Sequence, residues 1–238
     1  MMSPQRECPV CQAASCRHFI QVAPYDYWRC PFCEATFVDP AQLPSSDIER
    51  AQYHLHRNDV HDVRYRQFLA RLASPLLERL APNLSGLDYG CGPGPALAAM
   101  LTEAGHRMAL YDPLFFDDPA VLGQRYDFIT CTEVVEHFHH PFAEFARLDQ
   151  LLKPGGWLAV MTTFQTDDAA FARWHYRRDP THVVFYRPTT FQAMARHYQW
   201  QCDIPCANVA LLYKPGRHQA TCASLGAWGS KGEGSPTL

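Results

Sequence analysis

From residue 84 onward, short apolar runs alternate with stretches of helical periodicity. Runs such as "YDFITC" and "WLAVMT" are typical of buried strands, whereas the stretches between them repeat apolar residues every three or four positions. The pattern predicts strands at 86–90, 107–111, 126–131 and 157–162, helices at 95–104, 141–152 and 189–198, and a closing antiparallel pair near 199–204 and 208–213. Because strands alternate with helices, we expect an α/β fold with a parallel sheet covered on both faces.

The first 82 residues follow a different pattern. Residues 1–40 are turn-rich and hold too little apolar mass for a core of their own, and a helical repeat of leucines follows after a short linker. We therefore expect an N-terminal module (1–40), a helical linker or lid (41–82), an α/β domain (83–216) and a Gly/Ser-rich tail (217–238) that is disordered.

Composition narrows the class of protein. Of the 238 residues, 47% are hydrophobic and 19% are charged, and no apolar run approaches the roughly 20 residues that span a bilayer. The N-terminus lacks the apolar region of a signal peptide, so we expect a cytoplasmic protein without a membrane span. A net charge of -3 gives no basic face for a nucleic-acid backbone, and we do not expect a nucleic-acid partner.

A glycine-rich turn follows the first predicted strand. The stretch "LDYGCGPGPALAAML" sets Gly90, Gly92 and Gly94 two positions apart, at the start of a helix. Glycines there let the backbone approach a ligand closely, and the helix N-terminus offers N–H groups to an anion. The spacing departs from the dinucleotide signature G-x-G-x-x-G, because Pro95 takes the place of the third glycine. A ligand with a carboxylate and an adenosine would use both features.

Asp112 ends the second predicted strand, eighteen residues after Gly94. A carboxylate at that position can accept hydrogen bonds from both hydroxyls of a ribose. The alternative is that Asp112 only starts the turn before Pro113. The glycines upstream favour the ribose interpretation.

Four segments resemble the successive motifs of class I S-adenosylmethionine-dependent methyltransferases. They are "LDYGCGPGPALAAML", "LYDP", "YDFITCTEVVEHF" and "LLKPGGWLAVMTT", in that order, and the resemblance covers roughly residues 84–215. It is nearest to the small-molecule methylases grouped with the ubiquinone-biosynthesis enzymes. The resemblance implies a Rossmann-like, mostly parallel sheet with an antiparallel last strand, and S-adenosylmethionine as the cofactor over the carboxyl ends of the first strands.

The resemblance also assigns cofactor contacts. Asp88, Gly90, Gly92 and Gly94 would contact the amino-acid and ribose part, Asp112 the ribose, and Thr132 and Glu133 would flank the methionyl end. One departure is that only residues 113–126 separate Asp112 from Asp127, too few for a helix and a further strand. We therefore expect a reduced third strand, with residues 114–116 covering the adenine.

Two histidines are candidate bases, which methyl transfer needs only when the acceptor binds protonated. His137 follows the strand at 126–131, and His182 lies in a loop rich in aromatic and charged residues. Either can instead be structural, His137 by holding the loop after its strand. Arginines at 177, 178 and 187 suggest an acidic or phosphorylated acceptor, although a solvated face would look the same.

Four cysteines have the spacing of a structural zinc site. Cys8 and Cys11 form one C-x-x-C knuckle, and Cys30 and Cys33 form the second. Four thiolates leave no open coordination position, so a Zn²⁺ ion there would stabilise and not catalyse. Cys16 is a conceivable substitute ligand.

These observations leave three functions open. The first is a methyltransferase that acts on a small molecule at oxygen, carbon or nitrogen. The second is an RNA methyltransferase that docks through the zinc module. The third is a zinc-dependent binding protein with an inactive methyltransferase domain. The intact glycine turn and Asp112 favour the first, because an inactive domain has no need of them.

Overall fold

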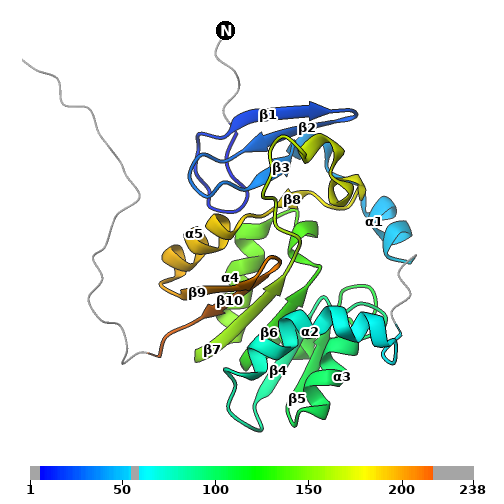
Figure 1. Ribbon diagram of the computed structural model, residues 1–238, viewed down its shortest axis with the longest axis vertical. Coiled ribbons are helices and arrows are strands. Elements are labelled where there is room, and N and C mark those ends of the chain that lie inside the picture. The colour runs from blue at the N-terminus through cyan, green and yellow to red at the C-terminus, as the bar shows by residue number, and fades with distance from the viewer. Residues whose placement is uncertain (1–5, 55–58, 217–238) are drawn as a thin grey trace, which may run out of the picture.

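The computed structural model describes residues 6–54 and 59–216, and Figure 1 shows its two sheets and the helices between them. The tail predicted at 217–238 lies outside the described residues. A six-stranded sheet forms the centre of the molecule, and a smaller four-stranded sheet lies at one end of it (Figure 1).

The central sheet has the strand order β5-β4-β6-β7-β10-β9. Its strands are β4 (Ser85–Tyr89), β5 (Arg107–Tyr111), β6 (Tyr126–Thr132), β7 (Leu152–Met161), β9 (Gln201–Cys206) and β10 (Val209–Tyr213). β5, β4, β6 and β7 pair in parallel, whereas β10 runs antiparallel to both β7 and β9. The prediction of a mostly parallel sheet with an antiparallel last strand is confirmed.

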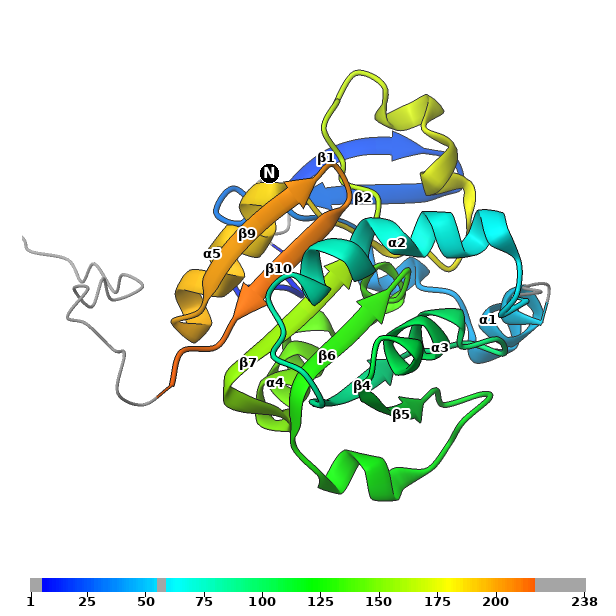
Figure 2. The same ribbon diagram turned by 60° about the horizontal axis from the view of Figure 1, so that its bottom comes forward.

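Helices cover both faces of this sheet, because alternate residues along the buried strands face opposite sides. Phe128 packs with α2 (Val63–Leu77) and α3 (Ala96–Glu103), whereas its neighbour Ile129 packs into the cluster that holds the buried residues of α4 (Pro141–Leu151) and α5 (Pro188–Tyr198). Figure 2 shows α2 and α3 in front of the strands and α4 behind them. The predicted helices at 95–104, 141–152 and 189–198 are present within one residue at each end.

The third strand of the family pattern is absent from the described residues, as predicted. After β5 the chain passes through a short 3-10 helix, η2 (Pro119–Gly123), directly into β6. β5 is therefore an edge strand of the central sheet. β7 is longer than predicted, since it begins at Leu152 and not near residue 157.

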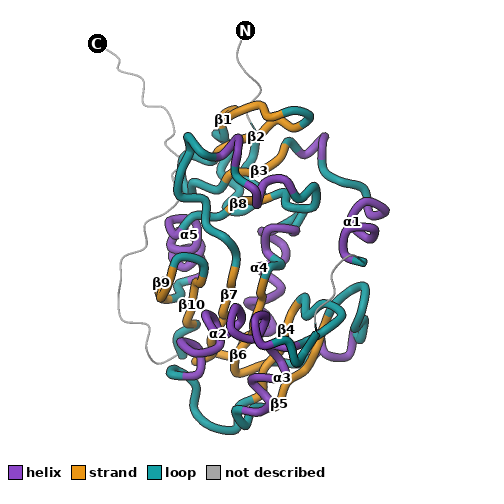
Figure 3. Tube along the Cα trace, turned by 45° about the vertical axis from the view of Figure 1, so that its right-hand side comes forward, coloured by secondary structure: helices purple, strands orange, loops and turns teal. Residues whose placement is uncertain are grey.

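The N-terminal module forms an antiparallel sheet that the periodicity did not predict. Its strands are β1 (Arg17–Val22), β2 (Tyr25–Arg29) and β3 (Thr36–Val38), and the fourth strand is β8 (Val184–Phe185) from the α/β domain. Thr36 lies opposite Phe185, and Phe37 lies opposite Val184. Figure 3 shows β8 against β3 at the end of the molecule away from β5. The module also shares one buried apolar cluster with α4 and α5, which supplies the core that its own residues lack.

The linker holds helix α1 (Ser46–Tyr53) and α2, separated by residues 54–62, of which 55–58 lie outside the described part. Short 3-10 helices complete the structure: η1 (Pro40–Gln42), η3 (Val135–His137), η4 (Phe171–Arg173) and η5 (His175–Arg178). Among the described residues, no helix combines the length and the apolar character that crossing a membrane requires.

Candidate active site and metal centre

A cavity of about 770 Å³ opens at the carboxyl ends of β4, β5 and β6. Parallel α/β sheets bind their ligands at this edge, and the volume falls within the range of about 300–1,000 Å³ for small-molecule sites. Eight of the nine residues predicted for the cofactor and for catalysis line the cavity: Asp88, Gly90, Gly92, Asp112, Thr132, Glu133, His137 and His182. Gly94, the ninth, lies in the bend before α3 and does not line it.

The glycine turn has the backbone that its sequence predicts. Gly90 and Gly92 have φ values of 76° and 63°, in the left-handed region that favours glycine. A Cβ atom on Gly90 would lie 2.5 Å from a methyl carbon of Val134. The turn can therefore hold no side chain at Gly90, and its backbone borders the cavity directly.

Asp112 accepts hydrogen bonds from the glycine turn and also lines the cavity. Its Oδ1 accepts hydrogen bonds from the N–H groups of Leu114 and Phe115, at 2.9 and 3.2 Å, while its Oδ2 accepts one from Gly92 N at 2.9 Å. The turn interpretation is seen in these hydrogen bonds, and the ribose contact stays a prediction for a side chain that lines the cavity. Leu114 and Phe115 line the cavity next to Asp112, where the adenine was expected.

Asp88 lies beneath the glycine turn and is almost inaccessible to solvent. Thr130 Oγ1 donates a hydrogen bond of 2.7 Å to its Oδ1. Burial nevertheless raises the pKa of Asp88 to about 6, because the hydrogen bonds offset only part of the lost hydration. A cationic group bound in the cavity would restore its charged form.

The predicted residues Thr132 and Glu133 end β6 at the cavity. Glu133 has φ 53°, which is uncommon for a residue with a side chain, and its N–H donates to Met161 O at 2.8 Å. Neither the Oγ1 of Thr132 nor the Oε1 of Glu133 has a hydrogen-bond partner among the described residues, although both atoms are buried. Burial raises the pKa of Glu133 to about 7.

The two predicted histidines lie together, with ring centroids 4.7 Å apart. His137 Nδ1 lies 3.0 Å from Thr181 O, and His182 Nδ1 lies 2.7 Å from Tyr176 O. A carbonyl oxygen only accepts, so each Nδ1 carries a proton and each neutral ring keeps its basic lone pair on Nε2. Either histidine can thus accept a proton or ligate a cation through Nε2.

Glu136 and Tyr176 are members of the site that the sequence analysis did not assign. Ligand atoms of Glu136, His137 and His182 all lie within 4.8 Å of one another, and we call these three residues the Glu–His cluster. The Tyr176 hydroxyl donates to Glu136 Oε1 and lies 3.2 Å from Glu133 Oε2. The signal for Glu136 was an acidic residue inside an apolar run, and the signal for Tyr176 was the aromatic-rich segment around His182, in which it lies in the short helix η5.

The donor set of the Glu–His cluster fits a divalent cation. Burial, and next the charge of Glu133, raises the pKa of Glu136 to about 7, and its Oε2 has no hydrogen-bond partner among the described residues. Tyr176 has a single hydroxyl proton for two carboxylates, so one of them lacks a donor. Carboxylate and imidazole ligands, each imidazole fixed by a carbonyl on its other nitrogen, match the second-shell pattern of metal sites.

Helix α1 forms the wall of the cavity opposite the sheet. The Tyr53 ring lies edge-on to His137, at 5.3 Å between centroids, and Gln52 Nε2 donates to Asp179 Oδ2 at 3.2 Å. Arg50 also lines this side. His137 of the Glu–His cluster thus contacts the α1 side of the cavity.

The arginines expected to face an acidic acceptor do not line the cavity. Arg177 donates to Tyr27 OH at 3.2 Å and to a backbone carbonyl, and Arg187 forms an ion pair with Asp168. These two side chains hold the loop against the N-terminal module. The expectation of an acidic or phosphorylated acceptor is therefore not supported by their positions.

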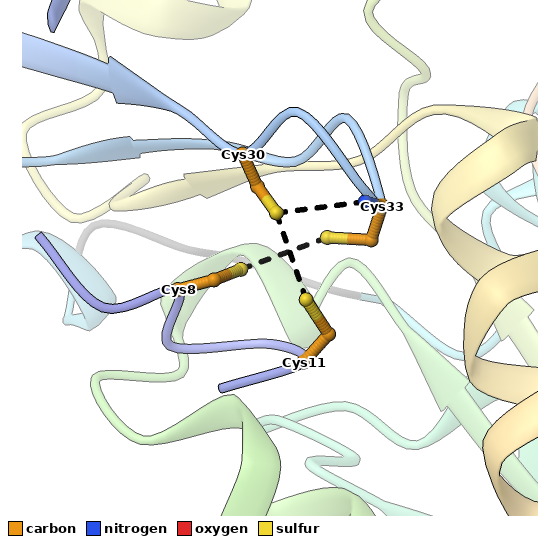
Figure 4. Close-up of side chains that lie close together, drawn as sticks. All are labelled: Cys8, Cys11, Cys30 and Cys33. Carbon is orange, nitrogen blue, oxygen red and sulfur yellow. Dashed lines mark hydrogen bonds between the residues drawn. The ribbon is translucent and has the colours of Figure 1, made fainter. Parts of the chain in front are cut away.

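The four cysteines converge as the spacing predicts. Figure 4 shows the sulfurs of two knuckles pointing toward one another. Cys8 Sγ lies 3.6 Å from Cys33 Sγ, and Cys11 Sγ lies 3.6 Å from Cys30 Sγ. Zn–S bonds of about 2.3 Å in a tetrahedron place sulfurs about 3.8 Å apart, so the four atoms fit a zinc ion. Cys16, the substitute ligand considered, is buried outside this group of four.

Comparison with known proteins places the domain in a family. The family model described as "Methyltransferase domain" matches residues 56–203, more than half of the chain. The ubiquinone biosynthesis O-methyltransferase of Leptothrix cholodnii is 37% identical over 67 residues, which cover 28% of this chain and 27% of that protein. The Proteus mirabilis enzyme of the same name is 28% identical over 100 residues, covering 42% and 41%. The chain thus spans less than half the length of these curated relatives.

Solved structures include a Burkholderia thailandensis 1,6-didemethyltoxoflavin-N1-methyltransferase with bound S-adenosylhomocysteine. It is 20% identical, covers 83% of this chain and 98% of its own, and has a TM-score of 0.49. The family match and the strand order with its antiparallel β10 agree. The chain belongs to the family of methyltransferase domains, with the fold of a class I S-adenosylmethionine-dependent methyltransferase.

Proposed function

We propose that this protein transfers the methyl group of S-adenosylmethionine to a hydroxyl oxygen of a small molecule. The observation that carries the proposal is that the glycine turn and the two histidines of the Glu–His cluster line the same cavity. One supplies a surface for the cofactor and the other a proton acceptor for the substrate. The partial likeness to O-methyltransferases supports an oxygen acceptor.

The cofactor end is assigned to residues at the ends of β4, β5 and β6. The backbone of the glycine turn would lie against the amino-acid part of the cofactor, the Asp112 carboxylate would accept hydrogen bonds from the ribose hydroxyls, and Asp88 would lie beneath them. When bound, S-adenosylmethionine supplies a methyl group on a sulfonium, which carries its own leaving group. The task left to the protein is to align the acceptor and exclude water.

The acceptor end is assigned to the Glu–His cluster. A hydroxyl is a poor nucleophile until it loses its proton, whereas an amine that binds neutral needs no base. His182 holds its Nε2 in the basic form through the bond from Nδ1–H to Tyr176 O. We assign it the acceptor's proton, with His137 beside it as a second nitrogen of the same kind.

The Glu–His cluster would also hold a divalent cation beside this base. Glu136 and His137 would supply the ligand atoms, and Glu133 brings a further carboxylate through its contact with Tyr176, while His182 Nε2, which takes the acceptor's proton, stays free of the metal. A cation there would supply Lewis-acid polarisation of the acceptor hydroxyl. The unpartnered carboxylate oxygen of Glu136 is the observation that supports it.

The cysteine cluster, Cys8, Cys11, Cys30 and Cys33, is assigned a structural zinc ion. Cys30 Sγ accepts hydrogen bonds from the N–H groups of Phe32 and Cys33, at 3.4 and 3.5 Å, which favour a thiolate at that position. All four ligands come from the protein, so this ion takes no part in the chemistry.

Two measurements test the proposed function. Calorimetry with S-adenosylhomocysteine should give one site per chain, and S-adenosylmethionine with a radiolabelled methyl group should label phenols and catechols in a panel that also contains amines. Activity on a hydroxyl acceptor, lost on treatment with EDTA and restored by Mg²⁺ or Co²⁺, is the expected result. Labelling of amines alone would contradict the oxygen acceptor, and absence of cofactor binding would contradict the whole proposal.

A further inference from the structure

Strand β8 lies between the N-terminal module and the Glu–His cluster. On one side, Val38 N donates to Val183 O at 2.9 Å, next to the pairing of β3 with β8. On the other side, Val183 N donates to Glu136 O at 2.8 Å. Val183 also follows His182 directly in the chain. Val183 thus connects β3 of the module to Glu136 by backbone hydrogen bonds and to His182 by a peptide bond.

Tyr186 forms a second connection. Its side chain is fully buried in the apolar cluster that also holds Cys8 and Cys33, and its hydroxyl donates to Val135 O at 3.0 Å. Val135 begins η3, which carries Glu136 and His137. The position of η3 therefore depends on a side chain that packs in the core shared with the zinc knuckles.

Side chains of the module also contact the loop that contains Gln165 and Asp168. Thr36 Oγ1 donates to Gln165 Oε1 at 2.7 Å, and Gln165 N donates to Tyr186 O at 2.8 Å. Arg29 forms an ion pair with Asp168 at 2.8 Å. The contact of Thr36 with Gln165 is buried, whereas the Arg29–Asp168 pair is exposed, and both join this loop to the module.

The charges of the module favour this role over docking to a nucleic acid. Two of its described arginines are neutralised within the protein, Arg6 by Asp39 and Arg29 by Asp168. The edge of β3 that a partner strand could use is occupied by β8. The face of the module that carries β3 contacts the methyltransferase domain.

We propose that the N-terminal module is a positioning element of the methyl-transfer site. The cysteine cluster fixes β3, β3 fixes β8, and β8 with Tyr186 sets the separation of His182 from Glu136 and His137. This inference rests on the proposed function for its catalytic consequence, but its structural claim holds without it. Loss of the zinc site should loosen the acceptor end of the cavity and leave the glycine turn intact.

Hydrogen–deuterium exchange compares the zinc-loaded chain with Cys33→Ser, and needs no acceptor. We expect faster exchange in segments 134–138 and 182–186, and unchanged exchange in segments 86–92 and 107–112, with affinity for S-adenosylhomocysteine within about threefold of the wild type. Faster exchange confined to residues 6–39 would overturn the proposal. So would global exchange, since the module would then be required for folding as a whole.

Tyr186→Phe tests the same connection with the cysteines intact, and His18→Ala, on the exposed side of the module, is the matched control. For Tyr186→Phe we expect full zinc content by elemental analysis, faster exchange at 134–138, weaker binding of Co²⁺ to the zinc-loaded protein, and a fall in kcat of about tenfold or more. The control should match the wild type in each measurement. Unchanged exchange at 134–138 in Tyr186→Phe would overturn the proposal, whereas an inactive wild type would contradict only the proposed function.

Discussion

His137 and His182 lie ring against ring, 4.7 Å apart between centroids, although one follows β6 and the other precedes β8. Each donates from Nδ1 to a backbone carbonyl, and the fully buried Glu136 lies beside them. The arrangement costs stability, because a buried carboxylate and two imidazoles are desolvated together. Buried ionisable groups of this kind beside a cavity are typical of ligand-binding sites.

The ribose assignment predicts the effect of Asp112→Asn. The amide keeps the shape of the side chain, and its oxygen can still accept the hydrogen bonds from Leu114 and Phe115, but its NH2 group then faces the N–H of Gly92 and the charge that strengthens bonds from ribose hydroxyls is lost. We expect affinity for S-adenosylhomocysteine to fall by about 10- to 100-fold in calorimetry, with a lower melting temperature because the hydrogen bond from Gly92 is lost. Unaltered affinity would remove Asp112 from the cofactor site.

The glycine turn predicts a difference between two Gly→Ala variants. Gly90→Ala places a methyl group 2.5 Å from Val134 and also requires a left-handed alanine, which costs about 1–2 kcal/mol. Gly105→Ala requires the same backbone strain, at φ 93°, but meets no atom within 4 Å. Gly90→Ala should therefore abolish cofactor binding, whereas Gly105→Ala should only lower the free energy of unfolding. Equal binding by both variants would contradict this account of the turn.

Two substitutions separate cation binding by the Glu–His cluster from its role as a base. Glu136→Gln removes a ligand charge, so we expect it to abolish binding of Co²⁺ to the zinc-loaded chain and to raise the melting temperature of the metal-free protein at pH 8. His182→Ala should lower kcat by about 10²–10⁴, with affinity for the cofactor little changed. Wild-type kcat and KM for His182→Ala would show that this histidine is structural.

The cysteine cluster predicts one zinc ion per chain. Elemental analysis should find near-stoichiometric zinc in the wild type and in Cys16→Ser, because Cys16 lies outside the group of four sulfurs. Cys30→Ser should lose the metal. If Cys16→Ser lost it instead, the ligand set would need to be reassigned.

Asp88 predicts a pH-dependent difference in stability between the wild type and Asp88→Asn. Burial raises the pKa of Asp88 in the folded protein to about 6, above its ordinary value of 3.8, so the protonated acid favours folding at low pH and that contribution is lost as the pH rises through 6. From pH 4.5 to 7 the wild type should lose about 2 kcal/mol relative to the variant, which does not titrate there. Urea unfolding at both pH values measures the difference, and a constant gap would show that Asp88 is charged throughout.

Periodicity was sufficient for the central sheet. The strand predicted at 107–111 has those bounds in the structure, and the flanking helices agree within one residue, because their apolar spacing reflects burial on one or both faces. The glycine turn, Asp112 and the cysteines were found for a similar reason. In each case the chemistry needs particular residues at a short fixed spacing.

The parts that were missed depend on contacts between distant segments. β8 has only two residues, too few for any periodicity, and it is a strand because β3 lies beside it. Tyr176 joins the site from the short 3-10 helix η5, and Arg177 of the same helix donates to Tyr27 and does not line the cavity. Local sequence does not identify such distant partners. Arg177 and Arg187 were therefore expected to face an acceptor, although neither lines the cavity.

The pairing of Thr36 with Phe185 has a consequence for how the chain is made. During synthesis the two knuckles emerge early and can close on a metal, whereas the strand that completes their sheet emerges only after almost the whole α/β domain. Until then β3 presents an unpaired edge, which is a template for association with other chains. A nascent or truncated chain that ends before Val184 should therefore depend on chaperones and aggregate more readily than the complete one.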